Sequence, residues 1–486
     1  MKGTIFALSA LAAAFLDAAT IDRMVVRQQW PWNGKVRVEY IVSGATAPQD
    51  VSVAISQDEQ AVDVSGTDRA TVLVGDLHGV ANGVHSFAID ADQLPASVRK
   101  DADVTVSLAL ADSPAGMTDA IDLIVDLVNA SNITYVSRAD LLDGKYGTYE
   151  TDYSAFGSNF STPLSCPIVW TGVTNDVKYM TTHMVLRKIS VANQAIAIGT
   201  SKASSWSGYG TRDKERTVKL TSDYWIGVFE VTQEQYAKMG VAAVAHRFNN
   251  AAYAATRPAE TIKYDSLRGT NLGAKWEKGV SIATARQVDN NTWFDVFRKR
   301  TGLERLDLPS GAQWEIACMA ANTSTPLYSG ENYATTSIKD NSNTKDANLD
   351  KLARYKWNGG YTNVWGNASY PAPEADCDTS LGTAKVGSYA PNAYGLYDML
   401  GNVSEWALDY LESDPDNTVV QVNPMGGTKS DNGRRVRRGG GWSDTINVVV
   451  TRWGPAISYA GAAEGHYGFR VCYTEHDDEA SEEVAE

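Results

Sequence analysis

The sequence has few cysteines, few prolines and no long apolar run beyond its first residues. Its 486 residues contain only 15 prolines, which argues against a proline-rich stalk. The four cysteines form no CxxC pair, which argues against a structural zinc site. In an exported chain they allow one or two disulfides, and three complete pairings are open. The cysteines are Cys166, Cys318, Cys377 and Cys472.

Basic residues are also in the minority. Lysine and arginine total 43 against 58 for aspartate and glutamate, which gives a formal charge of -15. Because an acidic chain repels the phosphate backbone, we expect no nucleic-acid partner. An acidic surface suits divalent cations such as calcium, although solubility is its commonest role. No segment after the N-terminal residues is long and apolar enough for a transmembrane span.

The first 19 residues are typical of a secretory signal peptide. Lys2 supplies the positive end, and Ile5–Leu16 is an apolar run too short to cross a bilayer as a mature helix. Small residues follow at Ala18 and Ala19, although Asp17 departs from the usual cleavage pattern. The alternative is a short buried N-terminal helix. We therefore expect a secreted, periplasmic or cell-surface protein.

Residues 20–135 are expected to form an all-β domain. Apolar and polar residues alternate along several short runs, and turn residues separate these runs, which is the pattern of strands with one buried face. Several such strands favour a β-sandwich of immunoglobulin or fibronectin type. The alternating apolar residues are Val36, Val38, Tyr40 and Val42, then Val51, Val53 and Ile55, then Val104, Val106, Leu108 and Leu110, then Ile121, Leu123, Val125 and Leu127.

Two stretches with less apolar patterning flank the C-terminal region. Residues 136–181 are rich in Gly, Ser, Thr, Tyr and Asp, which indicates a linker. Residues 476–486 are mostly acidic and are expected to be disordered. Between them, residues 182–475 combine helical signals with short strands, glycines and aromatic residues. We therefore expect an irregular α+β domain there.

Six segments of this C-terminal region are typical, in their order, of one family. Two of them contain capping boxes, Thr232 with Gln235 and Ser310 with Gln313, which predict helix starts. The segments read YWIGVFEVTQEQY, RPAETIKYDSL, LPSGAQWEIAC, GLYDMLGNVSEW, RRVRRGGGWS and GFRVC. They resemble the formylglycine-generating enzyme, or sulfatase-modifying factor, family. The resemblance covers about six tenths of the chain and implies a compact α+β fold related to the C-type lectin fold.

The resemblance also implies a chemistry for which this chain lacks the residues. Members of the family oxidise a sulfatase cysteine to formylglycine with oxygen and a copper(I) ion held by two cysteines, since soft thiolates suit copper(I). The matching positions after Gly439–Gly440 are Asp444 and Val449. A sister branch uses iron held by histidines, but the six histidines here show no metal-ligand spacing. We therefore expect neither copper nor iron, and we favour a non-catalytic domain.

The resemblance still implies calcium as a cofactor, with a structural role. In GLYDMLGNVSEW the family's carboxylate ligands fall on Asp398 and Glu405. Its carbonyl ligands fall on Gly401 and Val403, and such oxygen donors suit a hard cation. The alternative is a turn in which the two carboxylates cap backbone amides. A second, less closely matched set consists of Asn348, the Leu349 carbonyl, Asp378 (or Asp376 in its place) and the Ser380 carbonyl.

A groove on this scaffold is the expected binding site for a protein, peptide or glycan. The segment from Trp442 to Tyr467 would line it, since exposed aromatic residues among polar groups make good recognition surfaces. The alternative is that these aromatic residues fill the core. The selected groove residues are Trp442, Asp444, Asn447, Arg452 and Trp453.

Family members often link a helix cysteine to the cysteine that follows Gly-Phe-Arg in the last strand. Cys318 matches the first position, but Val471 follows Gly-Phe-Arg here and Cys472 comes one residue later. One residue changes the face of a strand. A Cys318–Cys472 bridge and two free buried thiols are therefore both open.

Three functions follow from these observations. The first is an exported protein whose C-terminal domain is a non-catalytic, calcium-stabilised binding module. The second is an enzyme of the family, with cysteine oxidation or an altered chemistry. The third is a structural or adhesion protein of the cell envelope. A calcium-dependent ligand would favour the first, a redox-active metal in the groove the second, and self-assembly the third.

Overall fold

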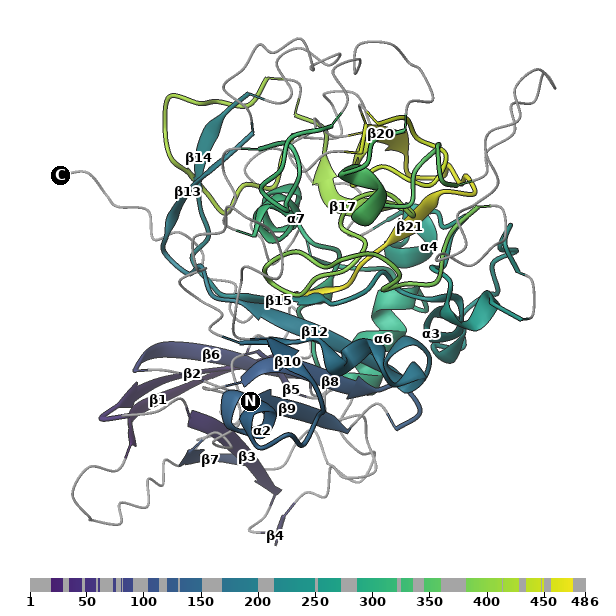
Figure 1. The fold of residues 1–486 in the computed structure, drawn as a ribbon. Helices are drawn as coiled ribbons and strands as arrows, with labels where there is room; N and C mark the ends of the chain where they lie inside the picture. Colours follow the sequence, from purple (N-terminus) through teal and green to yellow (C-terminus); the bar gives the residue numbers. More distant parts are fainter. Residues whose placement is uncertain are drawn as a thin grey trace. The chain divides into compact units, whose positions relative to one another are not determined.

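The computed structural model forms two compact units, whose elements are labelled in Figure 1. The units are Met1–Ala120 with Gly302–Glu304, and Ile121–Thr301 with Arg305–Glu486. The residues that the structure describes are 19–28, 35–45, 49–57, 60–61, 73–75, 80, 82–90, 104–112, 120–129, 132–150, 168–199, 214–249, 252–271, 286–320, 325–334, 345–359, 382–412, 414–427, 434–446, 448–449 and 456–474.

The first unit contains two antiparallel sheets that share one core. Alternate residues Val38, Tyr40 and Val42 are buried, and they belong to the same core as Val53 and Phe87. The same alternation of apolar residues in the sequence predicted strands in this region. The immunoglobulin or fibronectin type remains a prediction. One sheet has the order β1 (Thr20–Gln28), β2 (Lys35–Ser43), β6 (Gly83–Asp90), β5 (Leu73–Gly75), and the other β4 (Gln60–Ala61), β3 (Gln49–Gln57), β7 (Val104–Asp112).

The end of the first unit differs from the boundary expected at residue 135. The alternating run after residue 120 does form a strand, β8 (Ala120–Asp126), but β8 pairs with β12 (His183–Ile189), and Leu123 lies opposite Leu186. The next strand, β9 (Ile133–Ser137), lies beside β8 in the same sheet. Local alternation identifies a strand but not its neighbour. The sequence therefore predicted β8 correctly as a strand and placed it in the wrong sheet.

The stretch expected to be a linker, residues 136–181, is folded in its described parts. Trp170 is fully buried, and its Nε1 donates to the Tyr146 carbonyl at 2.9 Å. A large aromatic anchor can order a segment that lacks apolar periodicity. The elements are α2 (Arg138–Leu142), β10 (Tyr149–Glu150), β11 (Val169–Trp170) and the 3-10 turns η3 (Gly172–Thr174) and η4 (Val177–Met180).

A six-stranded sheet runs through the second unit. The last strand of the chain pairs with a strand some 250 residues earlier, so that Ile226 lies opposite Cys472. This pairing closes the domain by joining the ends of its sequence. The strand order is β16 (Leu306–Asp307), β22 (Cys472–Thr474), β15 (Tyr224–Gly227), β12, β8, β9.

A four-stranded sheet positions the candidate site. All seven residues of its strand β17 (Ser404–Tyr410) are buried, and Glu405 lies opposite Arg438 on one side and Gly468 on the other. Figure 1 shows β17 and β21 in the same layer. The order is β20 (Ala456–Tyr459), β19 (Arg434–Arg438), β17, β21 (Tyr467–Phe469), and a separate small sheet has the order β13 (Ala195–Ile198), β14 (Arg216–Lys219), β18 (Gln421–Val422).

Short helices complete the second unit. Both predicted capping boxes are confirmed: the Thr232 hydroxyl accepts from the Gln235 amide at 3.2 Å, and Ser310 accepts from Gln313 at 3.1 Å. Many strands and few helices agree with the expected irregular α+β domain. None of the described helices is long and apolar enough to cross a membrane. The helices are α3 (Gln233–Lys238), α4 (Tyr264–Arg268), α6 (Trp293–Thr301) and α7 (Gly311–Met319), with 3-10 turns η6 (Ala254–Thr256) and η7 (Leu349–Lys351).

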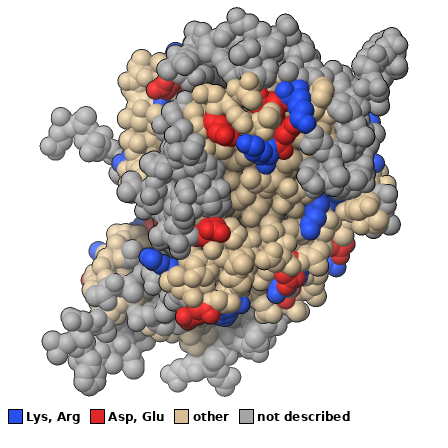
Figure 2. Space-filling model, viewed as in Figure 1, with Lys and Arg blue, Asp and Glu red and all other residues tan. Residues whose placement is uncertain are grey.

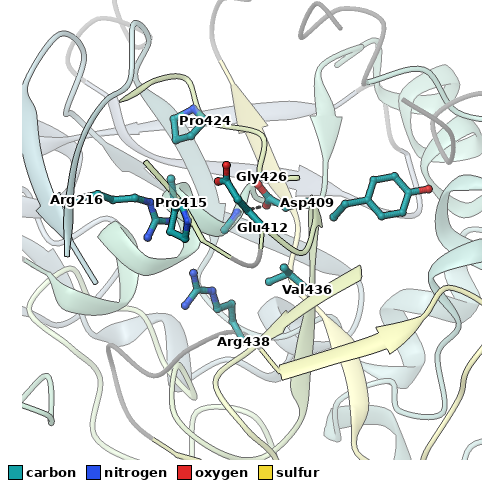
Figure 3. Close-up of a pocket in the computed structure, with 11 residues that line it drawn as sticks. Arg216, Asp409, Glu412, Pro415, Pro424, Gly426, Val436 and Arg438 are labelled. Carbon is teal, nitrogen blue, oxygen red and sulfur yellow. Dashed lines mark hydrogen bonds between the residues drawn. The ribbon is translucent and has the colours of Figure 1, made fainter. Parts of the chain in front are cut away.

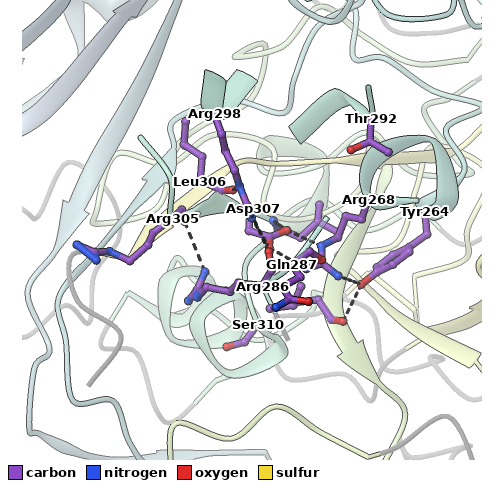
Figure 4. Close-up of polar contacts among 12 residues, drawn as sticks. Tyr264, Arg268, Arg286, Gln287, Thr292, Arg298, Arg305, Leu306, Asp307 and Ser310 are labelled. Atoms are coloured by element: carbon purple, nitrogen blue, oxygen red, sulfur yellow. Dashed lines mark hydrogen bonds and ion pairs between the residues drawn. The ribbon is translucent and has the colours of Figure 1, made fainter. Parts of the chain in front are cut away.

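A buried ion network joins α4, α6 and β16 (Figure 4). The Asp307 carboxylate accepts from Arg268 Nε at 2.7 Å and from Arg298 Nη2 at 2.9 Å. Arg268 also donates to the Tyr264 hydroxyl at 3.0 Å, and Asp307 accepts from the Leu308 amide. Because these partners compensate each buried charge, the network serves to hold three elements together.

Candidate functional site

The loop before β17 is sharply bent, and the bend brings the predicted calcium ligands into the interior. Asp398, Gly401 and Asn402 all have positive φ, of 55°, 79° and 54°. A Cβ at Gly401 would lie 2.2 Å from the Arg354 carbonyl oxygen, so only glycine fits there. The loop then enters β17, in which Glu405 is buried.

A buried arginine occupies the centre of this region. Arg470, which is fully buried, donates from Nη2 to Glu405 Oε1 at 2.8 Å. Its Nη1 donates to the carbonyls of Gly227 and Val228, at 2.8 and 2.9 Å. Glu405 also accepts from Trp314 Nε1 at 2.7 Å. Glu405 is therefore well compensated, and both of its oxygens have partners.

Two more carboxylates lie close to Glu405. Glu230 accepts from Asn402 Nδ2 at 2.7 Å and from the Val403 amide at 2.9 Å. Asp398 Oδ2 accepts from the Gly387 amide at 2.6 Å, while its Oδ1 is buried and has no hydrogen-bond partner among the described residues. Three carboxylates thus surround the guanidinium of Arg470, which leaves an excess of acidic groups in the interior.

Burial raises the pKa of two of these acids, Asp398 and Glu230. It raises the pKa of Asp398 to about 7, and the nearby Glu405 adds to the effect. It also raises the pKa of Glu230 well above its usual value, with further contributions from Asp398 and Glu405. Because the pKa values of both acids are raised, this region favours either protonated carboxyl groups or an added positive charge.

Asp398 suits the calcium ion that the family resemblance implies, whereas both Glu405 oxygens already accept hydrogen bonds. Asp398 offers an unpartnered buried oxygen, and the surplus of carboxylates suits a hard cation. The predicted set would combine two carboxylates with the Gly401 and Val403 carbonyls. Within the described parts of the chain, no three His, Cys, Asp or Glu side chains converge to hold a metal by themselves. The cation therefore remains a prediction that depends on backbone carbonyls.

The second predicted calcium set is described only in part. Asp378 and Ser380 lie outside the described residues. The Leu349 carbonyl already accepts from the amides of Leu352 and Ala353, just after η7, and Asn348 Oδ1 lies 3.5 Å from Lys351 Nζ. An ammonium group at that distance competes with a metal ion for the same oxygen. This set stays a prediction.

The positions that match the family's copper ligands are in a Gly-rich turn after β19. Val449 is fully buried, and a Cβ at Gly440 would lie 2.9 Å from its Cγ2. Asp444 is half-buried, and its Oδ2 accepts from the Gly441 amide at 2.8 Å. An alkyl group and a hydrogen-bonded carboxylate do not fit copper(I), which takes soft thiolate ligands.

The two described cysteines are free thiols and both are buried. The Cys318–Cys472 bridge is therefore not formed, and the alternative of free thiols is confirmed. Cys318 Sγ lies 3.8 Å from the Met399 carbonyl, whereas burial raises the pKa of Cys472 to about 12. The one-residue displacement in the last strand accounts for this, because it turns the side chain to the other face. Cys166 and Cys377 lie outside the described residues.

The aromatic residue at the start of the predicted groove belongs to the core. Trp442 is 2% exposed, its Nε1 donates to the Gly465 carbonyl at 2.8 Å, and its ring meets Phe248 edge-on. Trp442 therefore presents no exposed ring to a ligand, as the core-filling alternative expected. Asp444 remains partly accessible. The other selected groove residues, Asn447, Arg452 and Trp453, lie outside the described residues.

Charged side chains that the sequence did not select lie around Asp444. Burial lowers the pKa of the half-buried His466, while Asp444 opposes this effect and Arg437 and Arg247 reinforce it. The Arg247 guanidinium lies 5.7 Å from the centroid of the Trp442 ring. Neither Arg247 nor His466 falls in a family signature segment, although His466 lies within the Trp442–Tyr467 stretch that was expected to line the groove. By contrast, Glu230 and Arg470 stood inside such segments and could have been selected.

A small charged pocket lies beside the N-terminus of α7 (Figure 3). Its free volume of about 30 Å³ holds one or two water molecules, which is too little for an organic substrate. Arg438 pairs with Glu315 at 3.2 Å, and Asp409 accepts from the Gly311 amide. Burial raises the pKa of Asp409 to about 6. The acidic side chains of this pocket thus have partners among the protein's own basic and amide groups.

The visible surface has no dominant sign of charge. On the face in Figure 2, acidic and basic side chains of the described residues lie interspersed, without a broad patch of either sign. A mixed surface creates no long-range field that would identify a ligand site by itself.

Comparison with known proteins identifies relatives of the second unit. A family model described as "Sulfatase-modifying factor enzyme 1-like domain" matches residues 182–474. The protein named chaperone protein LppX, from Paenibacillus barcinonensis, is 29% identical over 272 residues, which cover 54% of this chain and 80% of that protein.

Two further relatives match over shorter stretches. The formylglycine-generating enzyme of Thermomonospora curvata is 34% identical over 84 residues, which cover 15% of this chain and 27% of that enzyme. The Bos taurus protein named inactive C-alpha-formylglycine-generating enzyme 2 is 29% identical over 128 residues, or 24% of this chain and 36% of that protein. The chain thus matches about a third or less of the length of these two relatives.

Proposed function

The chain belongs to the sulfatase-modifying factor family, and we propose that its family domain is a binding module without the family's copper-dependent oxidation of cysteine. The observation that carries this proposal is the pair of residues at the copper-ligand positions. Asp444 is engaged with the Gly441 amide, and Val449 is fully buried against Gly440. Neither residue supplies the soft ligand that copper(I) needs.

The two thiols in the described part of the chain, Cys318 and Cys472, are poorly suited to form a substitute copper site. Cys318 lies on α7 beside the Met399 carbonyl, and Cys472 lies in β22 opposite Ile226. Burial keeps Cys472 protonated, and a metal needs the thiolate. The name of the bovine relative, an inactive formylglycine-generating enzyme, supports the idea that the scaffold persists without the chemistry.

In this proposal calcium stabilises the scaffold. Asp398 and Glu405 would hold it with the carbonyls of Gly401 and Val403, and the ion would neutralise the surplus acidic charge beside Arg470. The cation supplies charge compensation only. The chain's own residues do the rest: Arg470 and Trp314 orient Glu405, and Gly401 permits the tight turn.

The proposed ligand is a protein or peptide, bound by an exported protein. The Paenibacillus relative is named a chaperone, a role that consists of binding other proteins, and it matches 54% of this chain. The apolar run in the first 19 residues supports export. The mixed charges on the viewed surface agree with a binding role that depends on local contacts.

A peptide-conversion assay tests the proposal. The purified, calcium-loaded chain is incubated with copper(I), oxygen and a peptide that carries the sulfatase target cysteine, and the peptide mass is followed. A catalytically active family member serves as the positive control. We expect the peptide mass to stay unchanged while the chain remains folded by circular dichroism. Conversion of the cysteine to the aldehyde by this chain would overturn the proposal.

A further inference from the structure

Arg247 lies beside the Gly-rich turn without an acidic partner. Its guanidinium carbon is 5.5 Å from the centroid of the Phe248 ring and 5.7 Å from that of the Trp442 ring, and the two rings meet edge-on. Arg247 is exposed, and it forms no hydrogen bond or ion pair with any residue that the structure describes. Two aromatic rings therefore orient a cation that no acidic side chain of the described residues compensates.

The backbone that carries Arg247 is fixed on both sides. The Glu260 carboxylate accepts from the Phe248 amide at 2.9 Å, and the Phe248 carbonyl accepts from Gln233 Nε2 at 3.0 Å. On the other side of Arg247, His246 Nδ1 lies 2.8 Å from the Glu260 carbonyl, to which it donates because a carbonyl only accepts. Arg247 is thus positioned before a ligand arrives, which lowers the entropy cost of binding.

A second donor, His466, lies close to Arg247 because two glycines leave space for both side chains. A Cβ at Gly465 would lie 2.5 Å from Arg247 Cδ, and a Cβ at Gly441 would lie 2.9 Å from His466 Cβ. The imidazole of His466 is half-buried and forms no hydrogen bond within the described part of the chain. A ligand that reaches Arg247 can therefore also use the ring of His466.

The charges around His466 favour a ligand group with a single negative charge. Burial is the largest effect on the pKa of His466 and lowers it, and Arg437 and Arg247 lower it further, whereas Asp444 and Glu464 raise it. Two cations and two carboxylates therefore act on this place. The cations attract an anion, but the two carboxylates oppose a second negative charge on it. A carboxylate therefore suits the place better than a phosphate dianion.

We propose that Arg247 and His466 form a subsite for one carboxylate group of an acidic peptide ligand. The planar guanidinium of Arg247 would hold both carboxylate oxygens with its fork of N–H groups, and the ring N–H of His466 would donate to one of them. Trp442, whose ring is buried, supports the guanidinium and does not contact the ligand. The proposal rests on the binding function above and names the chemistry of the peptide.

Histidine-ring NMR of the full chain tests this inference, because it detects weak binding at a named residue. The chain carries isotope-labelled histidine, and His466→Gln identifies the His466 signal. The probe is the blocked tripeptide acetyl-Gly-Glu-Gly-amide, with acetyl-Gly-Gln-Gly-amide as its uncharged counterpart and a phosphoserine tripeptide of the same form as the dianion. Arg247→Gln removes the guanidinium, and Arg138→Gln, at another exposed arginine, is the matched control. The other histidine signals report whether each variant is folded.

We expect the glutamate peptide to shift the His466 signal saturably and to bind at least ~10-fold more tightly than the glutamine peptide. Arg247→Gln should weaken its binding at least ~10-fold, as loss of a charged hydrogen-bond partner does, and Arg138→Gln should leave it unchanged. No saturable shift, equal binding of the two peptides, or an Arg247→Gln variant that binds like the wild type would overturn the inference. Tighter binding of the phosphoserine peptide would overturn it in favour of a phosphate subsite. Only aldehyde formation in the conversion assay speaks against the proposed function itself, so the two failures are distinguishable.

Discussion

Buried carboxylates of the second unit differ in how many partners compensate each one. Glu405 accepts from Arg470 and Trp314, whereas Asp398 accepts a single bond on Oδ2 and, among the described residues, none on Oδ1. An ionised carboxylate with so few partners destabilises a fold unless a cation joins it. Asp398 is therefore the residue at which added calcium should have the largest effect.

We predict that Asp398→Ala removes most of the stabilisation by calcium. A cation at a hundred times its Kd adds about 2.7 kcal/mol to the free energy of unfolding. For a large domain this amounts to a rise of a few degrees in Tm. Thermal unfolding in calcium and in chelator measures the rise for the wild type, for Asp398→Ala and for the exposed control Asp143→Ala. The same calcium response in all three chains would exclude Asp398 as a ligand.

The helix α7 contacts several of the segments around the site. Its first amide, from Gly311, donates to Asp409, and its Trp314 donates to Glu405. Glu315 accepts from the Gly199 amide at 2.6 Å and pairs with Arg438. The position of this helix thus depends in part on Asp409, a buried carboxylate whose charge depends on pH.

The pH dependence that Asp409 contributes has a definite sign. Burial raises its pKa from 3.8 in the unfolded chain to about 6 in the fold, although the Gly311 amide and Arg438 oppose the rise. The stabilising contribution is therefore fully present below pH 3.8 and is lost as the pH rises through about 6. The difference between the two pKa values corresponds to about 3 kcal/mol.

We predict that Asp409→Asn abolishes this contribution while keeping an acceptor for the Gly311 amide. The free energy of unfolding, from denaturant titrations followed by tryptophan fluorescence, is compared at pH 4 and pH 7. We compare the free energy of unfolding of Asp409→Asn with that of the wild type at each pH. This difference should favour the variant more at pH 7 than at pH 4, by up to about 3 kcal/mol. The exposed Asp143→Asn serves as control. A variant that parallels the wild type at both pH values would refute the assignment.

Elements with strong local signals could be predicted from the sequence, but the elements that they contact in the fold could not. Thr232 and Ser310 cap helices as expected because a capping box is complete within four residues. The alternating run around Leu123 predicted β8, but its partner Leu186 lies 63 residues later, beyond any local pattern. Trp170 anchors a stretch whose composition indicated a linker.

In the molecule as a whole, the family scaffold is retained and the residues of its oxidation chemistry are replaced. The sequence could predict this because the signature segments place Asp444 and Val449 where the family has cysteines. It could not predict that Trp442 is buried, because an aromatic residue in a Gly-rich turn is compatible with either environment. The cluster of Arg247 and His466 near Asp444 depends on contacts between distant segments, which only the fold reveals.

The central claim, that this domain has no copper site, is tested most directly by an anaerobic copper(I) titration against a chromophoric chelator. The wild type is compared with the double variant Asp444→Cys/Val449→Cys, which returns two thiolates to the family positions. We expect the wild type to leave the chelator's copper in place and the double variant to withdraw about one copper per chain. Tight, stoichiometric copper(I) binding by the wild type would contradict the claim.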